Sequence, residues 1–230
     1  MKRMGKLLAG VVTFGLMVPV VASAGSFVNT TFVDSGKGSF TTNIVTSKVG
    51  AFDVKLKDDK GNYSYGDEYF TAFCVDPWQA SASVSNVTFV KPSDTTYGLQ
   101  AAWLFNSVFA PNKVPTRTEI AGLQLALWEV VVDFGKALDL TVGNFIVKSG
   151  DAASISLAAS YLKALPTTFT QAVIEQLNSA FIIGKTPTKQ DLIVKIGDVN
   201  TNPVPEPTTM LLLGAGLLGL VGFARKNKTR

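Results

Sequence analysis

Two apolar segments, one at each end of the chain, most constrain what it can fold into. The first runs over residues 7–21, behind a start that carries three cations, and ends at the small residues Ala22-Ser23-Ala24. This order is typical of a secretory signal peptide, so residues 1–24 are expected to be removed after Ala24 by a signal peptidase. A membrane anchor or an N-terminal core helix is the alternative, but the run is short for a span.

The second apolar segment covers residues 210–224 and is followed by the basic end 225–230. It predicts one C-terminal transmembrane helix over 208–224, with 225–230 on the cytoplasmic side. The preceding residues 199–207 hold three prolines and predict an extended linker. The remaining residues, 25–198, form a single exported globular domain by size.

The charge and residue counts exclude several classes of function. Of the 21 basic residues, seven lie in the two end segments, which leaves 14 against 17 acidic residues. A weakly acidic domain is not expected to bind nucleic acid. The chain has no histidine and one cysteine, which excludes Ser-His-Asp and Cys-His catalysis and an internal disulfide. We therefore expect neither an enzyme nor a site for a metal or cofactor.

The residue pattern predicts an α+β fold with a β-rich N-terminal half, sandwich or barrel-like. Alternating or β-branched segments predict strands over 40–46, 51–56, 68–75 and 83–90. The polar residues 58–62 predict a turn, and we do not interpret them as a calcium loop because the full ligand spacing is missing.

A helical insertion is expected to follow, before a final C-terminal strand over 190–196. Helices are predicted over four segments: 97–109, from Thr116 or Thr118 to about 134, from Asp151 to 165, and 167–183. The second of these helices carries an apolar stripe of residues at helical spacing: Ile120, Leu123, Leu127 and Val131.

The C-terminal tail resembles the PEP-CTERM sorting tail of Gram-negative bacteria that make extracellular polysaccharide. The matching parts are Pro205-Glu206-Pro207, the apolar helix 210–224 and the basic cluster that begins at Arg225. The resemblance implies that an exosortase cuts near the Pro-Glu-Pro motif, so the protein would stay in the inner membrane transiently and then reach the cell surface or the medium. An ordinary tail anchor with a proline-rich spacer is the alternative.

Two residues of the domain attract attention on chemical grounds. Cys74 is the only thiol, at the end of an expected strand, and a free cysteine in an exported protein is either inert and buried or used chemically. Gln124 lies within an apolar helix, where a buried amide must find hydrogen-bond partners. We therefore expect Gln124 to connect this helix to a specific group.

Around these residues the chain resembles the bacterial Cys-Gln thioester domains of surface adhesins. Residues 73–75 fit the aromatic-Cys-apolar motif, and 123–128 resemble the Thr-Gln-x-Ala-Ile-Trp motif, with Leu123 where the family has Thr. Residues 189–194 fit the late glutamine motif except for Lys189 in place of an apolar residue. The resemblance implies a thioester between Cys74 and Gln190. Gln124 would be a supporting residue, and we assign the same role to Trp128 and Asp76.

Such a thioester would make the protein a covalent adhesin that acylates a surface amine or hydroxyl group once, without turnover. The alternative is a structural or polysaccharide-binding matrix protein with an inert Cys74, in which exposed aromatics such as Trp78 and Tyr97 stack on sugars. On that interpretation Trp128 is a core residue, and Asp76 and Asp133 are surface or capping groups. An ice-binding protein lacks the expected regular threonine ladder here, and no carboxylate pair suggests a hydrolase.

Overall fold

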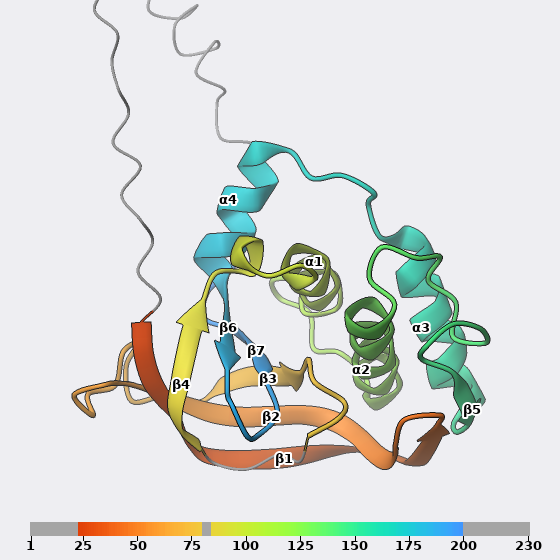
Figure 1. Cartoon of the computed structure of the whole chain (residues 1–230), viewed down its shortest axis with the longest axis horizontal. Helices are drawn as coiled ribbons and strands as arrows, with labels where there is room; N and C mark the ends of the chain where they lie inside the picture. Colours follow the sequence, from red (N-terminus) through yellow and green to blue (C-terminus); the bar gives the residue numbers. More distant parts are fainter. Residues whose placement is uncertain (1–22, 80–83, 200–230) are drawn as a thin grey trace, which may run out of the picture.

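A computed structural model describes residues 23–79 and 84–199 of the chain. It confirms the mixed class: within the described residues, helices pack against one antiparallel sheet (Figure 1). The strands are β1 (Ser23–Thr42), β2 (Thr46–Asp58), β3 (Phe70–Cys74), β4 (Val84–Val90), β5 (Val147–Ser149), β6 (Phe181–Lys185) and β7 (Leu192–Lys195). The helices are α1 (Gly98–Val108), α2 (Arg117–Val132), α3 (Ala152–Ala164) and α4 (Gln171–Ala180), with a short 3-10 turn at Pro92–Asp94.

The strand pairings close on themselves. The order in the sheet is β2-β3-β7-β6-β4-β1-β5, and β1 also pairs with β2. Six strands therefore form a ring, and β5 extends the sheet beyond β1. This arrangement is the barrel-like form of the two expected architectures, and the long β1–β2 hairpin can curve because its register shifts twice, between Val28 and Thr31 and between Asp34 and Ser39.

One predicted strand, 40–46, is wrong as a single element. The chain turns between β1 and β2, and Thr42 fixes the turn. Its amide donates to the carbonyl of Val45 at 2.9 Å, and its hydroxyl oxygen accepts from the amides of Ile44 and Val45. A threonine side chain can bond the backbone of a turn in this way and so compete with strand pairing.

The central helix α2 begins where the sequence predicts. Thr116 and Glu119 form a reciprocal capping box at its N-terminus. The helix is buried around its whole circumference over residues 121–130, and not only along the predicted apolar stripe. Two residues of that stripe, Ile120 and Val131, are only partly buried. The helix packs against β1 and β2 on one side and against α1 and α3 on others (Figure 1). Gly122 permits the close approach to α3, since a Cβ there would lie 3.0 Å from the carbonyl oxygen of Ser154.

The helix predicted over 167–183 is also wrong in its second half. Helix α4 ends at Ala180, and Phe181 has extended backbone angles and starts β6. Strand β6 pairs with β4 on one side and with β7 on the other. Its side chains Phe181, Ile182 and Ile183 are buried. Burial and pairing of aromatic and β-branched residues outweigh the helical pattern that precedes them. The expected final strand is present as β7.

Within residues 23–79 and 84–199, no helix is long and apolar enough to cross a membrane. The expected transmembrane helix 208–224 and the basic end lie outside the described residues, as does most of the expected signal peptide. Strand β1 begins at Ser23, two residues before the expected cut, and pairs there with Phe89 of β4.

Candidate functional site

Cys74 is the last residue of β3, and its pairing with β7 brings it near Gln190. Cys74 lies opposite Leu192 in the antiparallel register, and the amide of Val75 donates to the carbonyl of Asp191 at 2.9 Å. Gln190 lies two residues before Leu192, just outside β7, and lines the same pocket as Cys74.

Gln124 of α2 holds the backbone of Cys74 at both polar groups. The amide of Cys74 donates to Gln124 Oε1 at 3.1 Å, and Gln124 Nε2 donates to the Cys74 carbonyl at 2.8 Å. Because Val75 bonds toward β7, the polar groups of Cys74 point the other way, toward β2. The β2–β3 pairing ends at Phe52 and Ala72. The side chain of Gln124 therefore acts as the missing strand partner, which is the specific connection its buried position requires.

The thiol of Cys74 is held by α2 and by its own strand end. Trp128, one helical turn after Gln124, donates from Nε1 to Cys74 Sγ at 3.3 Å. The amide of Asp76 also donates to Sγ at 3.3 Å, and Sγ lies 3.2 Å from the Asp76 carbonyl. Two N–H donors thus converge on the sulfur, and both would stabilise a negative charge there.

Burial is nevertheless the dominant influence on this thiol. Cys74 is 2% exposed, and removal from water raises its pKa to about 12. The hydrogen bonds from Trp128 and Asp76 lower the pKa, whereas the charges of Asp76 and Asp191 raise it slightly further. At neutral pH the group is a protonated thiol and a poor nucleophile toward reagents in solution.

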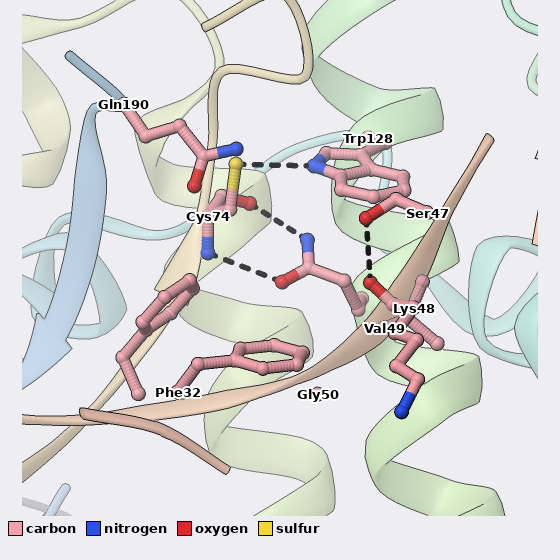
Figure 2. A pocket seen from close by; sticks show the side chains of 10 residues that line it. Phe32, Ser47, Lys48, Val49, Gly50, Cys74, Trp128 and Gln190 are labelled. Atoms are coloured by element: carbon pink, nitrogen blue, oxygen red, sulfur yellow. Dashed lines mark hydrogen bonds between the residues drawn. The ribbon is translucent and has the colours of Figure 1, made fainter. Parts of the chain in front are cut away.

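Cys74, Gln124, Trp128 and Gln190 line one pocket of about 170 Å³ (Figure 2). Figure 2 shows the amide of Gln190 directed toward the sulfur of Cys74. The oxygen Oε1 of Gln190 is buried and has no hydrogen-bond partner in the described part of the chain. A buried amide oxygen without a partner costs stability, so this oxygen is free to accept from a group that enters the pocket.

The other wall of the pocket was not predicted from the sequence. It consists of residues from β1 and β2: Phe32, Ser47, Lys48, Val49, Gly50 and Phe52. Gly50 is the one sequence signal that could have indicated a close approach here, because a Cβ on it would lie 2.1 Å from the carbonyl oxygen of Val33. The ammonium group of Lys48 pairs with Asp34 at 2.8 Å and points away from the sulfur.

The structure places Asp76 and Asp133 as buried capping groups, which is one of the two roles expected for them. Asp133 is fully buried, not a surface group, and its carboxylate accepts from the amides of Asn144 and Phe145 at 2.7 and 2.8 Å. Asp76 is 9% exposed and its carboxylate accepts from the amide of Trp78 at 3.1 Å. Both carboxylates therefore cap loop backbone from the interior.

The remaining predicted residues are placed as follows. Trp128 is buried, Trp78 is 60% exposed and Tyr97 is partly buried. The carboxylate of Asp58 accepts from the amides of Lys60 and Asn62, as the predicted turn requires. No group of three or more acidic or cysteine side chains in residues 23–79 and 84–199 could hold a metal ion.

Comparison with known proteins gives information on the tail. The family model for the PEP-CTERM protein-sorting motif matches residues 203–226, which include Pro205, Glu206, Pro207 and Arg225. No curated protein and no solved structure matches the chain. The match covers only the tail and supports an exported protein that an exosortase processes.

Proposed function

We propose that this chain is a surface or extracellular-matrix protein that uses an internal Cys74–Gln190 thioester as a covalent adhesin. The observation that carries the proposal is the shared pocket, in which the amide of Gln190 points toward a sulfur whose backbone is fixed by Gln124. Proximity within a rigid shell supplies most of the advantage for such a reaction.

The atoms of the reaction balance between the two side chains. Cys74 Sγ forms a bond to Cδ of Gln190, and the bond from Cδ to the amide nitrogen breaks. The thiol proton goes to that nitrogen, which leaves as ammonia. A hydroxyl or amine that later attacks Cδ forms an ester or amide and returns a proton to Cys74.

The surroundings support the storage of such a bond. Cys74 and Trp128 are almost wholly buried, so bulk water has little access to the sulfur. The two N–H groups directed at Sγ would also stabilise the sulfur as a leaving group when the thioester is attacked. The supporting role of Asp76 is then exerted through its backbone, and that of Gln124 through the position of β3.

The sorting tail gives the proposal its location. An exosortase would release the chain from the inner membrane near the Pro-Glu-Pro motif, which lies within the matched residues 203–226. The domain would then act at the cell surface or in the extracellular matrix.

The test is the intact mass of the full chain, freshly purified in detergent, before and after treatment with methylamine. A thioester makes the chain lighter by one ammonia than its sequence mass, and methylamine adds its own mass and frees Cys74 for titration. Cys74→Ala and Gln190→Ala should both abolish the deficit, while Gln79→Ala should retain it. A full sequence mass with Cys74 free from the start refutes the thioester.

A non-covalent matrix protein is the second candidate, and one observation favours it. The raised pKa of Cys74 is what an inert buried thiol would have. In that case the contacts of Cys74 with Gln124 and Trp128 only pack β3 against α2. The exported domain then acts as a non-covalent binding protein or as a structural component of the matrix.

A further inference from the structure

A second hollow adjoins the pocket of Cys74 and meets it at Gln190. Its volume is about 400 Å³, and it shares Ser47, Trp128 and Gln190 with the first pocket. Its other lining residues are Val45, Pro77, Trp78 and Gln79. A molecule that occupies this hollow therefore lies beside the carbonyl carbon that the thioester would activate.

We propose that this hollow binds a neutral saccharide and presents one of its hydroxyl groups to Gln190. The inference rests on the proposed function for its covalent step, while the binding step is independent of Cys74. Trp78 supplies the apolar platform: it is 60% exposed, the most exposed aromatic side chain among the described residues. The flat C–H face of a sugar ring can pack on such an indole.

The charges around the hollow favour a neutral ligand over a lysine side chain. None of the described residues that line the second hollow is charged. Among the described residues that line the first pocket, Lys48 alone is charged, and it is a cation paired with Asp34. A lysine ammonium that entered would lose water without gaining a carboxylate partner.

Two carboxylates that adjoin lining residues in the sequence, Asp76 and Asp191, are engaged in other contacts. Asp76 accepts from the amide of Trp78, and Asp191 accepts from the amide of Thr186 and lies 3.5 Å from Lys185. Neither lines the two hollows. Ser47 and Gln79 do line the second hollow. The hydroxyl of Ser47 donates to the carbonyl of Lys48 at 2.9 Å and can still accept, and an amide such as that of Gln79 can both donate to and accept from sugar hydroxyls.

The binding step is tested with the full chain carrying Cys74→Ala, which cannot form a thioester. The probes are neutral oligosaccharides of glucose, galactose, mannose and N-acetylglucosamine, and binding is followed by tryptophan fluorescence and by calorimetry. We expect at least one probe to bind, Trp78→Ala to weaken its binding by about tenfold or more, and Trp78→Phe to retain most of it. Tyr69→Ala, which removes another exposed aromatic ring, should leave binding unchanged.

The covalent step is tested with the wild-type chain and the same probes, in competition with Nα-acetyl-lysine methylamide. We expect a saccharide ester on Gln190 that hydroxylamine removes, together with a newly free Cys74. A chain that keeps a thioester but prefers the lysine probe overturns the inference and leaves the proposed function intact.

Two further outcomes separate the claims. If no thioester exists but the Cys74→Ala chain binds a saccharide through Trp78, the hollow is a non-covalent sugar site and only the covalent proposal is lost. If no probe binds, or if Trp78→Ala has no effect on binding, the saccharide inference is wrong whatever the state of Cys74.

Discussion

Gln124→Leu tests whether one side-chain amide completes the sheet at Cys74. Leucine has a similar volume and suits an apolar helix, so the substitution removes mainly the two hydrogen bonds to the backbone of Cys74. Both backbone groups are then buried without a partner, at about 1–3 kcal/mol each. We expect a loss of about 2–5 kcal/mol in the free energy of unfolding.

The assay is urea unfolding of the purified full chain, followed by far-ultraviolet circular dichroism. The midpoint should fall with little change in the denaturant slope, and the melting temperature should fall by roughly 5–20 °C. Gln124→Asn keeps the amide but shortens its reach, so it should also be destabilising. Gln171→Leu removes an exposed glutamine of α4 and should change stability by less than about 0.5 kcal/mol. A loss below about 1 kcal/mol for Gln124→Leu would refute the reasoning.

Three further predictions concern stability. Burial raises the pKa of Glu129 from 4.5 to about 7, so the folded state holds its proton more tightly than the unfolded state, and stability should fall as pH rises from about 4.5 to 7, by at most roughly 3 kcal/mol; Glu129→Gln should flatten this part of the pH profile of melting temperature. Asp133→Ala leaves two loop amides unpaired and should cost about 2–4 kcal/mol in urea unfolding, and a cost under about 1 kcal/mol would contradict this. Gly184→Ala places a Cβ 2.2 Å from a phenylalanine ring and should cost about 1–3 kcal/mol, whereas Gly197→Ala, with no atom nearer than 3.9 Å, should be close to neutral in the same assay.

The sequence predicted best what depends on local chemistry. The caps at Thr116 and Asp151 are where the helix signals put them, because a cap is decided within one turn. Strand β6 was missed because its partners, β4 and β7, are known only from the complete sheet. The sequence also left the choice between a sandwich and a barrel open, because the β1–β4 pairing that closes the ring joins strands far apart in the chain.

The candidate site divides in the same way. Cys74 and Gln124 can be recognised from the sequence alone, Cys74 as the single thiol and Gln124 as an amide among apolar residues. In the wall formed by residues 47–50, Gly50 signals a close approach of the backbone, but nothing in the sequence shows that the β2–β3 pairing ends at this point. It is the end of this pairing that opens the pocket, so the space for a ligand follows from strand register and not from a motif.

The raised pKa of Cys74 bears on how a covalent bond made here would behave. Once Gln190 has been transferred to a hydroxyl group, the reverse attack requires the thiolate of Cys74. Because burial raises the pKa of this thiol far above neutral pH, Cys74 is almost wholly protonated under physiological conditions. The burial that slows the formation of the thioester would therefore slow the reverse attack on the product as well. A linkage made once and rarely reversed suits adhesion, so an unreactive resting thiol does not by itself argue against the covalent proposal.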